Sequence, residues 1–431
     1  MPITVSLCAA TSLIMIASVL FFPRIKLGKF GVSTYWVVTV VGAAILLCSG
    51  LADAEITFHA LIANTAVNPL KILVLFLSMT LLSVFLDELG LFRFLASVAL
   101  KRAGGGQTRL FFLLYITVSV LTVFTSNDVI ILSFTPFVCY FAKNAKIDPV
   151  PYLAAEFVAA NTWSMALVIG NPTNIYLATA YGIDFLTYLK YSLVPTLFAG
   201  SAALICLFLL FRKRLSSPVE GEPEAVLLKD KLLLWVGIAH LAVCTVLLAV
   251  GSYFGAESWL VALCSVVSLF LVTTVISLVR KRPPRELKSS LKRAPYSLIP
   301  FVLSMFVMIV ALEQCGATDA IANFFGASYP VLKYGVASFF ASNLVNNIPL
   351  SVLFSAVLAG SEAGLPAVLA TVIGSNLGAF FTPIGALAGM MFTGILARHG
   401  VKFGYLDFLK LGATVALPAL AAALGGLLLV L

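Results

Sequence analysis

Long apolar runs recur along most of this chain of 431 residues. A helical run of about 20 apolar residues is long enough to cross a lipid bilayer. Seven such runs are visible: Ile3–Phe22, Thr34–Leu51, Leu70–Leu86, Tyr191–Phe211, Leu232–Val250, Ser258–Val279 and Leu298–Leu312. With 61% hydrophobic and 10% charged residues, the chain carries more apolar surface than a soluble core can bury. The sequence therefore predicts an all-α, polytopic membrane protein.

Positive charges gather in the short segments between these runs. The basic segments are 23–29, 101–109, 142–146, 212–214 and 280–293. The positive-inside rule places them in the cytoplasm and both termini outside. Because the membrane topology accounts for the positions of these Lys and Arg residues, the net charge of +9 does not indicate binding of nucleic acid. We expect a multi-pass protein of the cell inner membrane, whose first span is retained because no Lys or Arg precedes its long apolar run.

The two halves of the chain contain the same parts in the same order. We divide it into a first repeat (1–211), a polar cytoplasmic linker (212–231) and a second repeat (232–431). We expect scaffold helices in 1–86 and 232–312, and a hairpin followed by a broken helix in 110–190 and 331–400. The basic loops place the two openings on opposite sides of the membrane, which predicts inverted repeats. This architecture has roughly 10–12 membrane helices plus two hairpins.

A polar tip interrupts the apolar sequence once in each repeat. The first tip is Ser126-Asn127-Asp128, within "FTSNDVIILSFTPF" (124–137), and the second is Val345-Asn346-Asn347, within "SNLVNNIPL" (342–350). The flanking arms, 110–124 with 129–142 and 331–345 with 348–360, have 13 to 15 residues, which is short for a full crossing and suits a re-entrant hairpin. The candidate binding residues of the tips are Ser126, Asn127, Asp128, Asn343, Asn346 and Asn347.

A helix that cannot run unbroken follows each tip. "AANTWSMALVIGNPTN" (159–174) and "IGSNLGAFFTPIGALAG" (373–389) align with Asn161 opposite Asn376. Proline lacks an N–H and glycine loosens the backbone, so we expect both helices to unwind. The candidate binding residues here are Asn161, Thr162, Gly170, Asn171, Pro172, Thr173, Asn174, Ser375, Asn376, Thr382, Pro383 and Gly385.

Inverted repeats with broken helices are typical of secondary transporters whose site lies near the membrane midplane. Non-helical backbone survives at that depth only where protein buries it or where it lines a water-filled cavity. Helix N-termini there suit anions, and free carbonyl groups suit cations. An ion channel is the alternative from another class. An enzyme is not expected, because no constellation of nucleophile, base and metal ligands is visible.

Asp128 is the best candidate for coupling, because a carboxylate at membrane depth is costly and is functional by default. With Ser126 and Asn127 it offers oxygens for Na⁺ as the coupling ion. Glu156 is either a proton carrier or a residue near the cytoplasmic interface, and its distance from Asn161 favours the interface. Asp87, Glu88 and Glu313 end spans and are expected to be solvated caps.

The scattered cysteines and histidines lack metal-ligand spacing, so we expect no other metal and no cofactor. The expected partners are a small ion substrate and membrane lipid, and a homodimer is left open.

At the tips and breaks, the chain resembles the ion transporter superfamily. "GSNLGAFFTPIGALAG" and "LDFLKLGATVALPAL" (406–420) look like the C-terminal part of arsenite/antimonite permeases. "SNLVNNIPL" resembles the second tip of those permeases and of related sodium/proton antiporters. "IGNPTN" (169–174) is similar to a loop of divalent-anion/sodium symporters, and "SND" (126–128) is similar to their Ser-Asn-Thr tips.

The resemblance implies an ion-coupled transporter that works by an elevator motion, in which a hairpin-bearing domain slides against a scaffold. It leaves open whether the substrate is an inorganic or organic anion, arsenite or antimonite, or Na⁺ exchanged for H⁺. The arsenite-permease pattern tends to carry Asp where this chain has Asn161 and Asn376. Amides cannot carry protons, so a proton-coupled arsenite mechanism does not transfer directly to this chain.

Overall fold

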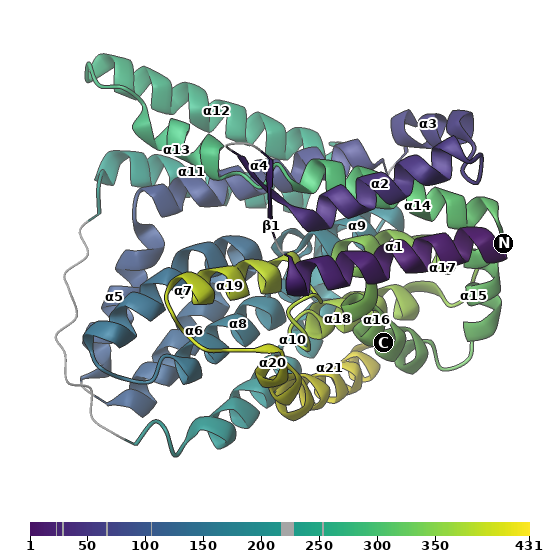
Figure 1. Ribbon diagram of the computed structural model, residues 1–431. Helices are drawn as coiled ribbons and strands as arrows, with labels where there is room; N and C mark the ends of the chain where they lie inside the picture. Colours follow the sequence, from purple (N-terminus) through teal and green to yellow (C-terminus); the bar gives the residue numbers. More distant parts are fainter. Residues whose placement is uncertain (23, 28–29, 66–67, 105, 217–227, 252–253) are drawn as a thin grey trace.

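The computed structural model describes residues 1–22, 24–27, 30–65, 68–104, 106–216, 228–251 and 254–431 (Figure 1). Most of the linker predicted at 212–231 lies outside the described residues, as do parts of the basic segments 23–29 and 101–109.

All seven predicted apolar runs are helical, and the all-α prediction is confirmed. In the first half the helices are α1 (Pro2–Phe21), α2 (Thr34–Cys48), α3 (Ala54–Ile62), α4 (Pro69–Glu88), α5 (Leu91–Ala103), α6 (Gln107–Phe124), α7 (Asn127–Asn144), α8 (Val150–Trp163), α9 (Pro172–Ala180) and α10 (Phe185–Phe211). In the second half they are α11 (Lys231–Gly251), α12 (Ser258–Val279), α13 (Arg285–Arg293), α14 (Leu298–Gln314), α15 (Ala317–Phe325), α16 (Pro330–Val345), α17 (Asn347–Ala359), α18 (Gly364–Gly378), α19 (Leu387–Arg398), α20 (Tyr405–Leu411) and α21 (Leu417–Val430).

Within the described residues, eight helical segments are long and apolar enough to cross a membrane, and four apolar helices are shorter. The arms of the first tip are longer than the sequence suggested: α6 and α7 have 18 residues each. The short-arm argument is therefore wrong for the first tip. It fits the second tip better, where α16 has 16 residues and α17 has 13.

A small antiparallel hairpin lies between α1 and α2 and was not predicted. Strand β1 (Arg24–Leu27) pairs with β2 (Phe30–Ser33), with Ile25 opposite Val32. The four-residue strands are too short to give a clear alternating pattern in the sequence.

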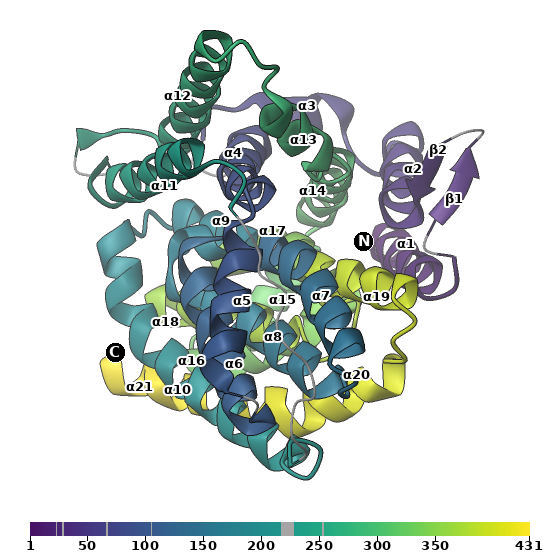
Figure 2. The ribbon, with the colours of Figure 1, turned by 90° about the vertical axis from the view of Figure 1, so that its left-hand side faces the viewer.

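The helices form two layers, and each layer contains helices from both halves of the chain (Figure 2). The upper layer in that view contains α1–α4 and α11–α14, and the lower layer contains α5–α10 and α15–α21. In the lower layer, Phe157 on α8 stacks on Phe392 on α19 with ring centroids 4.6 Å apart, and both rings meet Phe408 on α20 edge-on. Aromatic packing of this kind joins the two halves within the lower layer.

Polar contacts stay inside the layers. Ser304 Oγ donates to Thr39 Oγ1 within the upper layer, and Ser164 Oγ to Asn376 Oδ1 within the lower one. Apart from the turns that connect the layers covalently, no side-chain hydrogen bond or ion pair among the described residues joins one layer to the other. The layers are therefore held together mainly by apolar packing.

The end of α4 carries an ion-pair cluster instead of the solvated caps that the sequence suggested. Arg293 on α13 lies 2.6 Å from Asp87 Oδ2 and 2.6 Å from Glu88 Oε1. The Asp87 side chain is fully buried, and the Arg293 side chain is 30% exposed. A buried carboxylate needs a cation nearby, so Arg293 ties α13 to α4. Glu313 is exposed, as expected for a solvated cap.

Replacing Arg293 should destabilise the upper layer, because Arg293→Ala leaves Asp87 buried without its cation. We expect a loss of about 1–3 kcal/mol in unfolding free energy, measured by thermal or denaturant unfolding in detergent. Arg280→Ala is the matched control, since Asp230 bonds both Arg280 and Arg282 and keeps one of them. Equal losses for the two variants would contradict this role of Arg293.

Candidate functional site

Both predicted breaks are present in the structure. In the first half, α8 ends at Trp163, two short 3₁₀ turns cover Ser164–Ala166 and Val168–Gly170, and α9 begins at Pro172. The break thus starts earlier than the Ile169-Gly170 position that we expected. In the second half, α18 ends at Gly378 and α19 begins at Leu387, so residues 379–386 separate them.

Two glycines occupy equivalent positions in these breaks, because the chain folds back on itself there. A Cβ on Gly170 would lie 2.1 Å from the carbonyl oxygen of Ser164. A Cβ on Gly385 would lie 2.7 Å from the carbonyl oxygen of Gly378. Both distances are too short for any side chain, which explains why glycine stands at both positions.

Side chains already satisfy the carbonyl groups that the first break frees. We expected such carbonyls to bind cations, but here each accepts a hydrogen bond of 2.8–3.0 Å. The bonds run from Tyr188 to Met165, from Ser192 to Ala166, and from Asn174 to both Ser164 and Leu167. A cation would have to displace these donors, so this conformation offers no carbonyl cage in the segment 164–167.

A row of buried, hydrogen-bonded polar residues connects the first tip to the second, and one link runs from Ser164 Oγ to the backbone carbonyl of Asn161. In order, its members are Asn127, Asn161, Ser164, Asn376, Asn171 and Asn347. The tips do not bond each other directly in the described residues. The two broken segments lie between them and carry the connection.

Asn376 is the centre of this row. Its Oδ1 accepts hydrogen bonds from Ser164 Oγ (3.1 Å) and Asn171 Nδ2 (3.0 Å). Its Nδ2 donates to Asn174 Oδ1 (2.7 Å) and to the carbonyl of Val372 (2.8 Å). Asn376, from the second half, therefore forms hydrogen bonds with three residues of the first half: Ser164, Asn171 and Asn174. It does not bond Asn161, the residue opposite it in the alignment of the two halves.

The first tip is held by α8. Asn127 Nδ2 donates to Asn161 Oδ1 at 3.0 Å, and Asn161 Nδ2 donates to the carbonyl of Phe157 at 2.8 Å. Ser126 is the N-cap of α7, and its Oγ accepts from the backbone N–H of Asp128 at 3.3 Å. The tip is thus a capped helix N-terminus, with its backbone donors partly satisfied.

The second tip is strained and anchored to both breaks. Asn346 has a φ of 73°, which is unfavourable for a residue other than glycine. Its Nδ2 donates to the carbonyl of Ile384 (2.9 Å), and its Oδ1 caps α17 through the N–H of Ile348 (3.4 Å). The N–H of Asn347 donates to the carbonyl of Gly385 (3.0 Å), and Thr173 Oγ1 donates to the carbonyl of Asn347 (3.1 Å).

Of the remaining candidate residues, some hold the second break in place and others lie outside the row. Asn343 Oδ1 accepts from Thr382 Oγ1 at 2.7 Å, which holds the second break beside α16. Ser375 Oγ donates to the carbonyl of Val372 in its own helix, so it is outside the row. Pro172 is the first residue of α9, and Pro383 lies in the second break.

Three side chains of the region have oxygens without a donor. Asn347 Oδ1 and Thr162 Oγ1 are buried and unpartnered. Among the described residues, no hydrogen bond reaches the Asp128 carboxylate, and Asp128 is only 4% exposed. Unsatisfied buried acceptors are costly, and they are the groups that a bound ion would satisfy.

The charge of Asp128 acts on a residue of the upper layer. Asp128 belongs to the lower layer, yet it lies within electrostatic range of Tyr35 on α2 of the upper layer. The Tyr35 hydroxyl donates to Ser297 Oγ at 2.8 Å. A charge change at Asp128 therefore acts at the boundary between the layers.

Three helices begin inside this region: α7 at Asn127, α9 at Pro172 and α17 at Asn347. Their N-termini carry partial positive charge, roughly half an elementary charge each. The hydrogen bond from Thr173 to Asn347 brings two of them together. The region can therefore attract a small anion without Lys or Arg, which agrees with the absence of basic residues from the tips.

Glu156 is completely buried within the protein. Its Oε1 accepts from Thr135 Oγ1 at 2.8 Å. Helices α6, α7, α10 and α18 pack against α8, which its helical position alone could not reveal, and the position of Glu156 near the cytoplasmic interface stays a prediction.

Sequence reasoning missed Ser164, Tyr188, Ser192 and Tyr35. Ser164 lies three residues after Asn161 in the same motif and could have been included on spacing. Tyr35 and Ser192 lie in predicted apolar runs and Tyr188 lies three residues before one, so only the fold identifies them.

Comparison with known proteins gives consistent matches along the whole chain. The family model CitMHS, described as a citrate transporter, matches residues 13–367. The arsenical pump membrane protein of Escherichia coli is 27% identical over 98% of this chain and 98% of its own length. The putative arsenical pump membrane protein of Bacillus subtilis (strain 168) is 24% identical over 85% of this chain and 87% of its own length.

Two solved transporters have the same fold. The YdaH transporter of Alcanivorax borkumensis aligns over 99% of this chain and 96% of its own, with a TM-score of 0.55 and 14% identity. MtrF of Neisseria gonorrhoeae aligns over 97% of this chain and 94% of its own, with a TM-score of 0.55 and 11% identity. The membrane fold, the transporter neighbours and the family match agree, and the chain is an integral, multi-pass membrane transport protein that belongs to the CitMHS citrate transporter family.

Proposed function

We propose that this protein is a secondary active transporter that moves a small ion of the anion or arsenite/antimonite type across the cell inner membrane, coupled to Na⁺ or H⁺. The observation that carries the proposal is the row of buried amides between the two tips. Near the row, Asn347 Oδ1 and Thr162 Oγ1 are buried without a partner, and no hydrogen bond among the described residues reaches the Asp128 carboxylate.

The substrate site in this proposal lies at the second tip. The start of α17, the start of α9 and the free Oδ1 of Asn347 supply both positive potential and a hydrogen-bond acceptor. The positive potential favours the negative charge of a small ion, and the free Oδ1 of Asn347 can accept a hydrogen bond from an O–H group of that ion. Arsenite is the first probe because relatives are named arsenical pumps, and citrate is the second because of the family description.

The coupling site in this proposal lies at the first tip, where Asp128 provides the one carboxylate of either tip. With Ser126 and Asn127 it can supply oxygens to Na⁺, or it can take up a proton when no cation is present. The isolated carboxylate also supports a second candidate function, exchange of Na⁺ for H⁺ without another substrate. Transport of arsenite or citrate separates the two functions.

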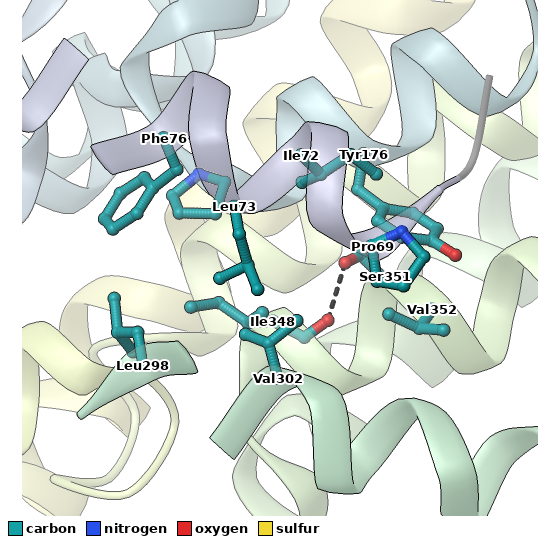
Figure 3. A pocket seen from close by; sticks show the side chains of 11 residues that line it. Pro69, Ile72, Leu73, Phe76, Tyr176, Leu298, Val302, Ile348, Ser351 and Val352 are labelled. Carbon is teal, nitrogen blue, oxygen red and sulfur yellow. Dashed lines mark hydrogen bonds between the residues drawn. The ribbon is translucent and has the colours of Figure 1, made fainter. Parts of the chain in front are cut away.

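An elevator motion fits the contacts between the layers. Where α4 and α14 face α9 and α17, a small pocket is lined almost entirely by apolar side chains (Figure 3). The hydroxyl of Ser351 in this pocket donates to Ile348 in its own helix at 2.6 Å. The lower layer, which carries the site, can move past the upper layer without breaking side-chain hydrogen bonds between them.

Asn347→Ala should weaken substrate binding without destabilising the fold, because its Oδ1 has no partner and its Nδ2 bond to Asn171 is long at 3.5 Å. We expect about a tenfold rise in the apparent Kd for arsenite, which corresponds to one lost hydrogen bond. Asn346→Ala is the contrasting control: it removes a cap and a tip anchor, and should cost about 1–2 kcal/mol of stability. If Asn347→Ala destabilised the fold as much and left binding intact, the substrate site would lie elsewhere.

Asp128→Asn should remove the dependence of transport on Na⁺ or on pH, because an amide neither binds Na⁺ strongly nor carries a proton. The measurement is arsenite uptake by proteoliposomes under imposed Na⁺ and pH gradients. Asp184→Asn makes the same chemical change at a helix cap at the edge of α10 and should leave both responses intact. An unchanged gradient response in Asp128→Asn would exclude the first tip as the coupling site.

A further inference from the structure

Glu156 is the buried acid that the proposed site does not use. It lies on α8, five residues before Asn161, and its side chain has no exposed surface. Thr135 on α7 donates to its Oε1 at 2.8 Å, while Oε2 is buried and unpartnered. The cost of burying an ionised carboxylate without a cation is several kcal/mol, so the neutral acid is the stable form here.

The surroundings of Glu156 contain no cation that could balance a negative charge. Helix α8 packs against α6, α7, α10 and α18, and Phe157, the residue after Glu156, also packs on α19 and α20. The titratable residues of α19 and α20 are all exposed: Arg398, Tyr405, Asp407 and Lys410. The basic residues of α6, α7 and α10 are Arg109, Lys143 and Lys190, and all three are exposed. None of them forms an ion pair with Glu156 in the described residues.

Besides Asp128 and Glu156, the buried titratable residues of α6, α7, α8 and α10 are one cysteine and three tyrosines. On α7, Cys139 faces Glu156 one turn beyond Thr135. The hydroxyls of Tyr115 on α6, Tyr188 on α10 and Tyr152 on α8 itself donate to Gly200, Met165 and Gln107. Helix α18 carries no titratable residue.

The contact between Glu156 and Thr135 lies at a weak point of α7. Pro136 follows Thr135 directly inside this helix. Proline lacks the N–H that would bond the carbonyl of Leu132, so α7 lacks one backbone hydrogen bond there and can bend. Because Asn127 joins the same two helices at the tip, a bend in α7 changes both contacts of the α7–α8 pair.

We propose that Glu156 is a second proton-binding site, which holds a proton in this conformation and releases it when the contact between α7 and α8 opens at Pro136. The proton sits on Oε2, comes from water on one side of the membrane and leaves to water after opening. This inference rests on the proposed transport function. It adds a second proton, separate from any proton that Asp128 binds.

Infrared spectroscopy tests the bound proton without any substrate. The purified protein should show the carbonyl stretching band of a neutral carboxylic acid, which persists at mildly alkaline pH and disappears in Glu156→Gln. Asp128→Asn distinguishes the two buried acids, because it should keep this band. The same band in Glu156→Gln, or its absence from the wild type, would overturn the proposal.

Transport tests the release of that proton. Glu156→Gln resembles the protonated acid and can keep the hydrogen bond from Thr135, so it should fold and exchange arsenite across the membrane. It should lose arsenite accumulation driven by a pH gradient, and Thr135→Val should shift the pH profile of accumulation without abolishing it. Unchanged accumulation in Glu156→Gln would overturn the release step. A wild type that moves neither arsenite nor citrate would overturn the proposed function, and the infrared result would still decide whether Glu156 holds a proton.

Discussion

Everything in this structure depends on satisfying backbone polar groups where two helices break at membrane depth. Lipid offers no hydrogen bonds, so each freed carbonyl and N–H needs a partner from the protein. Tyr188, Ser192 and Asn174 supply partners in the first break, and the second tip supplies them in the other through Asn346 and Asn347. Because the partners come from distant segments, the breaks hold the lower layer together while they form the candidate site.

This requirement also accounts for the difference between the layers. The lower layer concentrates the buried amides and hydroxyls, and the upper layer meets it through apolar side chains such as Leu73 and Val302. A polar bond between the layers would have to break in any sliding motion, whereas apolar contacts can be exchanged at low cost. The position of Asp128 at this boundary, near Tyr35, would let the charge state of the first tip influence the motion.

The sequence predicted the features that depend on composition and local chemistry. The lengths of the apolar runs predicted the membrane helices, and Pro172, Pro383 and the nearby glycines predicted the breaks. It could not predict partners, because hydrogen bonds such as Asn376 to Asn174 join residues far apart in the chain. The expectation of a solvated cap at Asp87 was wrong for the same reason, because its pairing with Arg293 depends on which helices surround α4. The burial of Glu156 also depends on the surrounding helices.

The central claim is that the lower layer carries the site past a stationary upper layer. Distances between spin labels, measured by double electron–electron resonance, test this claim most directly. In a cysteine-free background, Val279 on α12 and Leu406 on α20 label opposite layers, and Leu406 with Phe324 on α15 labels the lower layer alone; all three side chains are exposed. Adding arsenite together with Na⁺ or a change of pH should shift the distance distribution between Val279 and Leu406, while that between Phe324 and Leu406 stays constant. A fixed distance between the layers, or an equal change within the lower layer, would contradict the account.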